Sequence, residues 1–202
     1  MAVFFTDFLL IMNKLIFATH NVHKLEEVSA MLKDFVNVLG LSELNFFDDI
    51  PETADTLQEN ALQKAQFVKD KLGYDCFADD TGLEVDALNG APGVFSARYA
   101  GEPSNSERNI DKLLDVLKNI NNRAAQFRTT IALLQGDNVQ YFEGIIRGKI
   151  ATERHGKGGF GYDAVFIPDG YNKTFAELSQ KEKNAISHRG LAVEKLMENL
   201  KN

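Results

Sequence analysis

Four carboxylates in the first half of the chain have the types and spacing of a divalent-metal site. Asp79 and Asp80 stand where a short apolar run ends, and Glu52 and Glu59 precede them on a loop and at a helix start. Adjacent strand residues point to opposite faces, so we expect one aspartate to face a cleft and the other to anchor the loop. Mg²⁺ prefers one or two carboxylates together with phosphate oxygens and waters, which Asp80 with Glu52 would provide. An acidic turn with helix-capping carboxylates is the alternative.

A polar segment between the first expected strand and the first expected helix suits an anion. It consists of Thr19, His20, Asn21, Val22, His23 and Lys24. A helix N-terminus carries partial positive charge and free N–H groups, and Lys24 adds a full charge one turn in. The segment lacks the glycines of a Walker A loop. A capped helix with a solvated lysine is the alternative.

A glycine-rich loop in the second half of the chain offers a platform for a flat ring. It runs through Gly158, Gly159, Phe160, Gly161, Tyr162 and Asp163. Its glycines allow a close backbone approach, and its two aromatic side chains offer stacking surfaces. Its carboxylate can accept hydrogen bonds from a sugar or from base nitrogens. A purely structural turn is the alternative.

A basic segment near the end of the chain has the donors needed to select an oxopurine. Lys183 and Arg189 donate hydrogen bonds and cannot accept them, and His188 lies beside Arg189. The oxygen at purine position 6 accepts a hydrogen bond, whereas the amino group of adenine donates one. Fixed donors therefore leave adenine unpaired, a mismatch that can discriminate by about 10⁴ to 10⁵ in favourable cases. A solvated basic segment between two helices is the alternative.

The elements that must position these residues alternate between strands and helices. We expect strands at 14–18, 36–41, 75–78, 83–88 and 164–167, a hairpin at 126–134 and 139–151, and helices at 24–33, 57–72, 104–120, 179–184 and 190–200. Short apolar runs indicate the strands, and apolar residues at helical spacing indicate the helices. This mixture predicts an α/β fold with a mixed sheet. We expect residues 1–13 to be an N-terminal extension and residues 14–202 to be one domain.

The composition limits the partners and the compartment. The 202 residues include 29 acidic and 22 basic side chains, for a formal charge of −7, so we expect no nucleic acid polymer as a partner. A small polyphosphate needs only a local basic cleft and a metal. The apolar start, residues 1–11, is too short to span a bilayer and lacks the basic region of a signal peptide, so we expect no membrane partner. Cys76 is the only cysteine, which favours a reducing, cytoplasmic location.

Six segments in this order resemble the noncanonical purine nucleoside triphosphate pyrophosphatases, the inosine triphosphate pyrophosphatase family. They are residues 19–24, 59–61, 78–83, 90–99, 159–163 and 186–190. The likeness covers nearly the whole chain from Lys14 onward. The Gly-Ala-Pro-Gly to Ser-Ala-Arg-Tyr stretch and the Ser-His-Arg-Gly stretch are long and specific. The resemblance implies two α/β lobes around a central mixed β-sheet with flanking helices, an active site in the cleft between the lobes, a homodimer and dependence on Mg²⁺.

The resemblance also implies a reaction and a role for each matching residue. Water would attack the α-phosphate of inosine, deoxyinosine or xanthosine triphosphate, releasing the monophosphate and pyrophosphate and clearing deaminated purines from the nucleotide pool. Glu52 and Asp80 match the metal positions, and Asp80 also matches the proton acceptor. Lys64 matches a basic position near the phosphates, and Thr81 matches a substrate-contacting hydroxyl. The segment 19–24 matches the triphosphate loop. Phe160, Gly161, Tyr162 and Asp163 match the loop that stacks on the base and contacts the base or the sugar. Lys183, His188 and Arg189 match the base-recognition end.

Some departures and alternatives remain. His20 stands where many relatives have glycine, Thr81 stands where serine is common, and Ala164 replaces a frequent proline. A carboxylate bound to Mg²⁺ is a weak base, so the metal itself could acidify the water, or Asp79 could be the base.

The other functions we consider are a pyrophosphatase for modified pyrimidine triphosphates and a non-enzymatic nucleotide-binding module. Arg189 and the loop at 158–163 argue against the first, and the retained carboxylates argue against the second.

Overall fold

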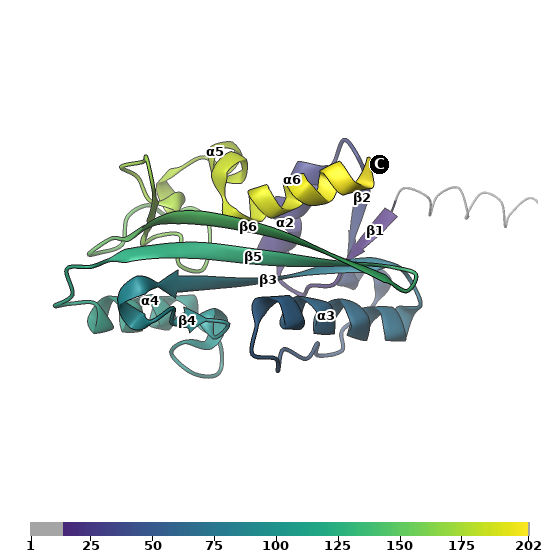
Figure 1. Cartoon of the computed structure of the whole chain (residues 1–202), viewed down its shortest axis with the longest axis horizontal. Coiled ribbons are helices and arrows are strands. Elements are labelled where there is room, and N and C mark those ends of the chain that lie inside the picture. The colour runs from purple at the N-terminus through teal and green to yellow at the C-terminus, as the bar shows by residue number, and fades with distance from the viewer. Residues whose placement is uncertain (1–13, 202) are drawn as a thin grey trace, which may run out of the picture.

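A mixed β-sheet forms the centre of the molecule (Figure 1). The computed structural model describes residues 14–201, so the expected extension 1–13 lies outside the described residues. The strand order is β2-β1-β3-β5-β6-β7, with β4 paired to β3. β1 is parallel to β2 and β3, whereas the pairs from β3 to β7 are antiparallel. The strands are β1 (Lys14–Phe17), β2 (Asn37–Gly40), β3 (Cys76–Val85), β4 (Pro92–Gly93), β5 (Ala124–Gln135), β6 (Asn138–Ile150) and β7 (Phe166–Pro168).

Helices cover both faces of this sheet. α3 lies on one face, and α2 and α6 lie on the other (Figure 1). Caps fix the limits of α3 as the sequence predicts, because Thr56 accepts a hydrogen bond from the backbone of Glu59 and Gly73 adopts a φ of 74°. The α-helices are α2 (Val22–Leu32), α3 (Leu57–Leu72), α4 (Ser106–Val116), α5 (Gln180–Ile186) and α6 (His188–Leu200). The 3₁₀ turns are η1 (Leu41–Leu44), η2 (Asp86–Leu88), η3 (Ser96–Arg98) and η4 (Phe175–Glu177).

Alternation along the strands divides the core of one lobe between the two faces of the sheet. Ile16 and Cys76 pack against α3, whereas their neighbours Phe17 and Phe77 face α2 and α6, where their rings stack at 4.5 Å. These two clusters form one lobe. The other lobe is a separate cluster at the far end of the long strands, where η2, α4, β7 and η4 pack together. The fold therefore agrees with the two-lobed α/β architecture that the resemblance implies.

β3 is longer than the sequence predicts. We expected the strand to end at Ala78, directly before the two aspartates. The strand instead continues through Asp79 and Asp80, which pair with Ile131 and Thr130 of β5. The second strand expected at 83–88 is the same strand, and its last residues form η2. Charged residues in a strand interior are unusual, and the ion pairs described below explain how they are accommodated.

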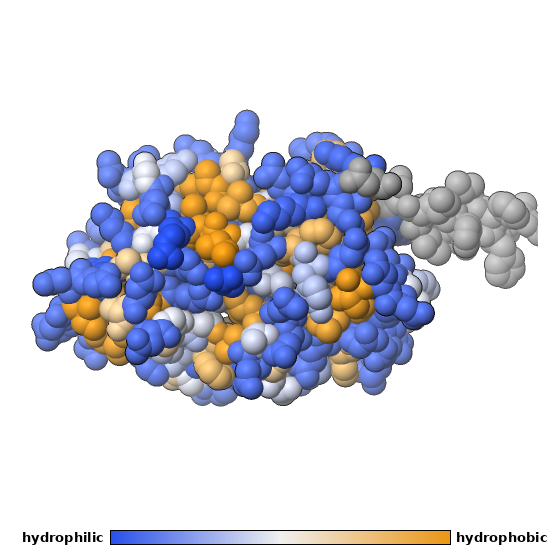
Figure 2. All heavy atoms as spheres, in the orientation of Figure 1, coloured by the Kyte–Doolittle hydropathy of each residue, from blue (hydrophilic) through white to orange (hydrophobic). Residues whose placement is uncertain are grey.

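The face of the molecule seen in Figure 2 is mainly hydrophilic. Figure 2 shows apolar side chains gathered where β6 passes beneath α5, with polar groups around them. Among residues 14–201, no helix combines the length and the apolar character needed to cross a membrane.

Candidate active site

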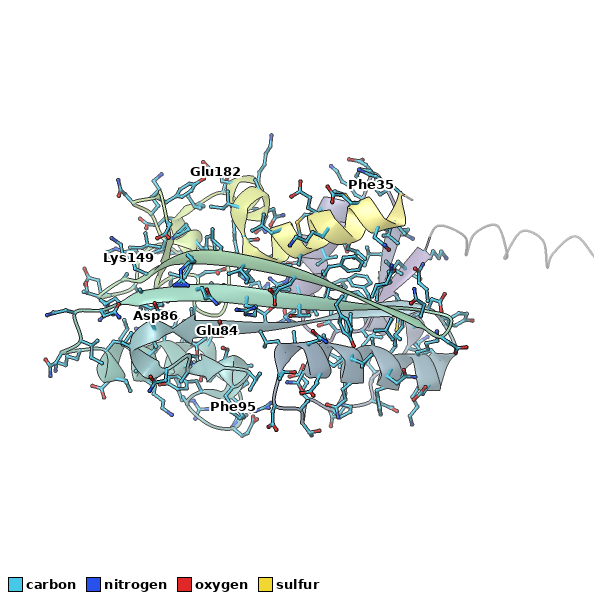
Figure 3. The ribbon with its side chains drawn as sticks, in the orientation of Figure 1. Phe35, Glu84, Asp86, Phe95, Lys149 and Glu182 are labelled. Atoms are coloured by element: carbon cyan, nitrogen blue, oxygen red, sulfur yellow. The ribbon has the colours of Figure 1, made fainter. Side chains whose placement is uncertain are left out.

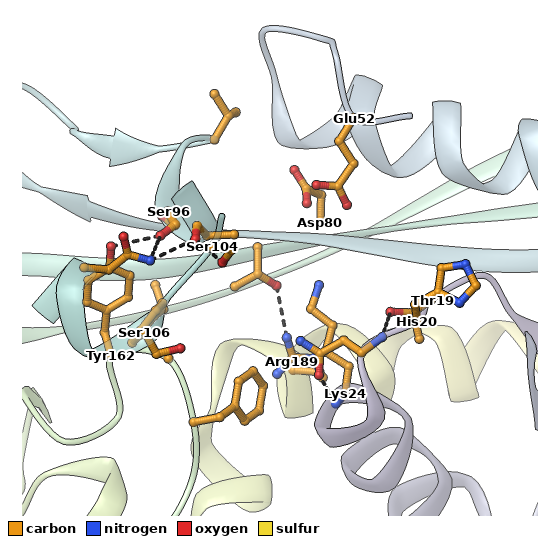
Figure 4. A pocket seen from close by; sticks show the side chains of 18 of the residues that line it. Thr19, His20, Lys24, Glu52, Asp80, Ser96, Ser104, Ser106, Tyr162 and Arg189 are labelled. Carbon is orange, nitrogen blue, oxygen red and sulfur yellow. Dashed lines mark hydrogen bonds between the residues drawn. The ribbon is translucent and has the colours of Figure 1, made fainter. Parts of the chain in front are cut away.

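A cavity of about 740 Å³ lies between the two lobes (Figure 4). Of the predicted site residues, Val22 and His23 do not line it. The structure thus brings together segments separated by up to 170 positions in the sequence, from Thr19 to Arg189. The predicted residues that line the cavity are Thr19, His20, Asn21, Lys24, Glu52, Lys64, Asp80, Thr81, Phe160, Gly161, Tyr162, Asp163, Lys183, His188 and Arg189.

One wall of the cavity carries a pair of carboxylates joined by a lysine. Lys64 Nζ donates to Glu52 Oε1 at 2.5 Å and to Asp80 Oδ1 at 2.9 Å, and Asn60 Nδ2 donates to Asp80 Oδ2 at 3.3 Å. Burial raises the pKa of the Asp80 carboxyl, and the Lys64 ammonium offsets only part of that rise. Burial also opposes ionisation of Glu52, but Lys64 outweighs it and holds the pKa of Glu52 below its ordinary value.

This wall fits a divalent cation that also binds phosphate. Glu52 and Asp80 share the Lys64 ammonium, so the ionised trio keeps a negative charge at the cavity. No group of three or more His, Cys, Asp or Glu side chains gathers as a metal cage among residues 14–201. Two carboxylates suit Mg²⁺, which completes its shell with phosphate oxygens and waters. Glu59 takes another role, because its carboxylate accepts a hydrogen bond from Thr56 at the start of α3.

Asp79 lies on the opposite side of β3 and anchors two cations. Lys24 Nζ donates to Asp79 Oδ1 at 2.8 Å, and Arg189 Nε and Nη2 each donate to Asp79 Oδ2 at 3.2 Å. Burial alone would raise the pKa of Asp79, but the two cations hold it well below its ordinary value. A carboxylate that stays ionised in this way is a weak proton acceptor, which argues against Asp79 as the base.

The predicted anion segment is a capped helix start whose lysine, Lys24, is half-buried with a 14% exposed side chain. Asn21 Oδ1 accepts from the backbone N–H of Lys24, and Thr19 Oγ1 accepts from that of Asn21. His20 lies 2.9 Å from the carbonyl oxygen of Asp48 through Nε2. Burial lowers the pKa of Lys24 despite the opposing effect of Asp79. The alternative of a solvated lysine is therefore wrong.

Glu27 of α2 holds two of the cavity residues in place, and the sequence reasoning missed it. Its carboxylate accepts from Lys183 Nζ and from Arg189 Nη1, both at 2.7 Å. Lys183 also donates to Asp163 at 2.6 Å, and Arg189 Nη2 donates to Thr81 at 3.2 Å. Both cations are buried, so the alternative of a solvated basic segment is wrong. The position of Glu27 one turn after Lys24 and next to the apolar face of α2 was the available signal.

The glycine-rich loop presents one aromatic ring to these cations. The Phe160 ring lies 4.9 Å from Lys183 Nζ and 5.6 Å from Arg189 Cζ, and its backbone N–H donates to Asp163 Oδ2. His23 stacks on the same ring at 5.3 Å. Tyr162 is buried, and its hydroxyl donates to the carbonyl oxygen of Ser96 at 2.9 Å. Phe160 is therefore the ring of this loop that lies closest to the basic end of the cavity.

His188 completes this end as an uncharged side chain. Its ring stacks on Phe127 at 4.5 Å, and Nδ1 has no hydrogen-bond partner within residues 14–201. Burial lowers the pKa of His188 well below its ordinary value, and the Arg189 guanidinium lowers it further. A neutral imidazole can both donate and accept, and a buried nitrogen without a partner costs free energy.

Comparison with known proteins gives a consistent result. The model of the Ham1 family matches residues 15–199. The dITP/XTP pyrophosphatase of Porphyromonas gingivalis is 57% identical over 92% of this chain and 96% of its own, and that of Flavobacterium johnsoniae is 52% identical over the same shares. A solved HAM1 protein from Coxiella burnetii superposes with a TM-score of 0.86 at 40% identity, covering 94% of this chain and 99% of its own. The Staphylococcus aureus Ham1 protein gives 0.83 at 41% identity, covering 93% and 98%.

Proposed function

The chain belongs to the Ham1 family, and from this premise we propose that it is an enzyme that hydrolyses dITP, ITP and XTP to the monophosphate and pyrophosphate. The observation that carries the proposal is that one and the same cavity holds a carboxylate pair, Glu52 and Asp80, and two buried fixed donors, Lys183 and Arg189. The names of the relatives, which match over more than nine-tenths of this chain, support it. They favour neither a pyrimidine-specific enzyme nor a binding module.

The acidic wall and the two nearby lysines would act on the triphosphate. Lys24, Lys64 and the N-terminus of α2 supply positive charge where phosphate oxygens would lie. We assign Mg²⁺ to Glu52 and Asp80, where it would neutralise phosphate charge and acidify water. As water attacks the α-phosphorus, the bond to the bridging oxygen breaks and pyrophosphate leaves. Asp80 is the proton acceptor that the resemblance implies; because a carboxylate bound to Mg²⁺ is a weak base, the metal would lower the pKa of the water and Asp80 would receive its proton.

The basic end of the cavity would select the base. Glu27 and Asp163 hold Lys183 in place, and Glu27 also fixes Arg189, so both side chains present donors in set directions. An oxygen at purine position 6 can accept from them, whereas an adenine amino group would leave two donors facing each other. The half-buried ring of Phe160 offers the base a stacking surface.

We also propose that the enzyme is a cytoplasmic homodimer. The resemblance to the family motivates the dimer, and the apolar area in Figure 2 and the 55% exposed side chain of Phe95 are surfaces that a second copy could cover. The single, buried, free Cys76 suits a reducing compartment. Light scattering on the purified chain tests the dimer, and a mass of one chain at micromolar concentration would contradict it.

A substrate panel tests the proposed function. The chain is assayed with ITP, dITP, XTP, ATP and a 5-substituted deoxyuridine triphosphate, with and without Mg²⁺. We expect kcat/KM for the three oxopurines to exceed that for ATP by about 100-fold or more, because ATP leaves buried donors unpaired. A pyrimidine that outruns ITP would replace the proposal with the pyrimidine hypothesis. Binding of ITP without any product would support a binding module.

A further inference from the structure

Arg98 reaches from one lobe to the loop that carries Glu52. It is the last residue of η3, which packs on the start of α4 in the lobe that holds β7. Its Nη2 donates to the backbone carbonyl oxygen of Glu52 at 3.1 Å, and its guanidinium carbon lies 5.6 Å from the centre of the Phe95 ring. Figure 3 shows Phe95 projecting from the edge of the molecule between α4 and α3. Arg98 is not one of the residues that line the cavity.

We call the loop at residues 45–56 the acidic loop. Apart from the bond to Arg98, the hydrogen bonds described next hold it to α3, in its own lobe. Gln63 of α3 exchanges two hydrogen bonds of 2.9 Å with Thr53, and Asn60 of α3 accepts from the backbone of Ala54 at 2.9 Å. These contacts fix the part of the loop that follows Glu52. Arg98 adds a contact from the opposite side of the cleft, at Glu52 itself.

We infer that Arg98 is a positioning residue for the metal site, which rests on the proposed function. By holding the backbone of Glu52, it keeps that carboxylate beside Asp80, where both can bind one divalent cation. An arginine suits this role because one nitrogen can bind a carbonyl while the flat guanidinium packs on an aromatic ring, and lysine has no such fork. Contacts that orient metal ligands typically change metal affinity by about 10- to 100-fold when removed.

Arg98 could affect metal affinity through its charge or by positioning Glu52, and the two effects have opposite signs. A cation near Glu52 repels a divalent metal, so removal of the charge alone would tighten metal binding. Loss of positioning would weaken binding. Arg98→Met removes both the charge and the hydrogen bond, and Arg98→Lys keeps the charge. Arg147→Met is the matched control, because Arg147 lies on β6 outside the cavity with a 58% exposed side chain.

Two measurements that do not depend on turnover test the inference. Mn²⁺ binding to the nucleotide-free protein is followed by electron paramagnetic resonance, and hydrogen exchange is followed in peptides covering the acidic loop. We expect both Arg98 variants to bind Mn²⁺ about 10-fold more weakly and to exchange faster in the acidic loop but not in β5 and β6. The Mg²⁺ concentration for half-maximal hydrolysis of ITP should rise, while kcat at saturating Mg²⁺ stays within about threefold. Arg147→Met should match the parent protein in all of these.

A double-mutant cycle with Glu52→Gln separates positioning from a general structural effect. If Arg98 acts through Glu52, Arg98→Met should weaken Mn²⁺ binding little further in the Glu52→Gln background. Additive effects, unchanged Mn²⁺ affinity or tighter binding in Arg98→Met would each overturn the inference. If Arg98→Met does not fold, Arg98→Lys carries the same test. A chain that hydrolyses no triphosphate would refute the proposed function, whereas Mn²⁺ binding and exchange would still decide the role of Arg98.

Discussion

The buried carboxylate of Glu27 gives a prediction whose size follows from its surroundings. The side chain is 5% exposed and accepts from Lys183 and Arg189, each at 2.7 Å. Burial raises its pKa, but Arg189 and Lys183 outweigh this and hold it below its ordinary value, so Glu27 is ionised at neutral pH. Glu27→Gln keeps the shape and removes the charge, leaving two buried cations with Asp163 and Asp79 as their remaining anions.

The expected destabilisation is large but leaves the protein folded. Removal of one partner from a buried ion pair typically costs about 3–5 kcal/mol, and glutamine keeps one accepting oxygen, so we expect about 3 kcal/mol. For a chain of this length, about 1 kcal/mol corresponds to a change of about 2–4 °C in Tm, so Tm should fall by about 6–12 °C. Domains are typically stable by about 5–15 kcal/mol, which leaves a margin.

Urea unfolding at neutral pH measures this change, and the neighbouring residue supplies the control. Glu26 lies on the same helix, with a 69% exposed side chain near His23, so Glu26→Gln should change the free energy of unfolding by less than about 0.5 kcal/mol. We also expect Glu27→Gln to reduce the preference for ITP over ATP, because Lys183 and Arg189 lose their common anchor. A loss below about 1 kcal/mol, or equal losses in the two variants, would refute the buried-network argument.

Three further predictions concern the cavity. Asp80→Asn should lower kcat by about 100-fold or more without unfolding the chain. Asp86 lies on a turn outside the cavity, so the control variant Asp86→Asn should keep the kcat of the parent protein. Full turnover in Asp80→Asn would contradict the role assigned to Asp80. Phe160→Ala should raise KM for ITP by about 10-fold, since base–aromatic stacking contributes about 1–3 kcal/mol, and an unchanged KM would argue against stacking. Because folding lowers the pKa of His188, the unfolded chain takes up a proton on this side chain as the pH falls below about 6.5, while the folded chain does not. The free energy of unfolding therefore falls by up to about 1.4 kcal/mol per pH unit below about pH 6.5. Urea unfolding of His188→Phe between about pH 6.5 and 5 should show a shallower fall, and parallel curves would contradict this account.

The sequence predicts those elements whose signals are local. α3 has the bounds, Leu57 to Leu72, that the spacing of its apolar residues predicts. The hairpin of β5 and β6 turns at Gly136, as expected. These signals lie within a few residues of the feature that they specify, so no knowledge of the tertiary fold is needed.

The missed features depend on partners that are distant in the sequence. The strand through Asp79 and Asp80 has the local appearance of a turn, and its charges are stabilised by Lys24, Lys64 and Arg189 from other elements. For the same reason, the sequence does not predict that Lys183 and Arg189 are buried, because a buried arginine and a solvated one have the same local sequence pattern.

Glu27 and Arg98 illustrate this limit most clearly. The partners of Glu27 lie 156 and 162 positions further along the chain. Arg98 binds a backbone carbonyl group 46 positions before it, a partner that no side-chain pattern reveals. The candidate residues were therefore identified by resemblance and residue type, whereas the contacts that orient them required the fold.

Hydrolysis of ITP in ¹⁸O-labelled water tests the central claim most directly. The products are separated and examined by mass spectrometry and ³¹P nuclear magnetic resonance, with Mg²⁺ present and with the metal chelated. Attack at the α-phosphorus places the label in inosine monophosphate, leaves pyrophosphate unlabelled and requires the metal. Labelled orthophosphate with inosine diphosphate would mean attack at the γ-phosphorus. Labelled pyrophosphate with unlabelled monophosphate would mean attack at the β-phosphorus, and either result would contradict the assignment of the cavity.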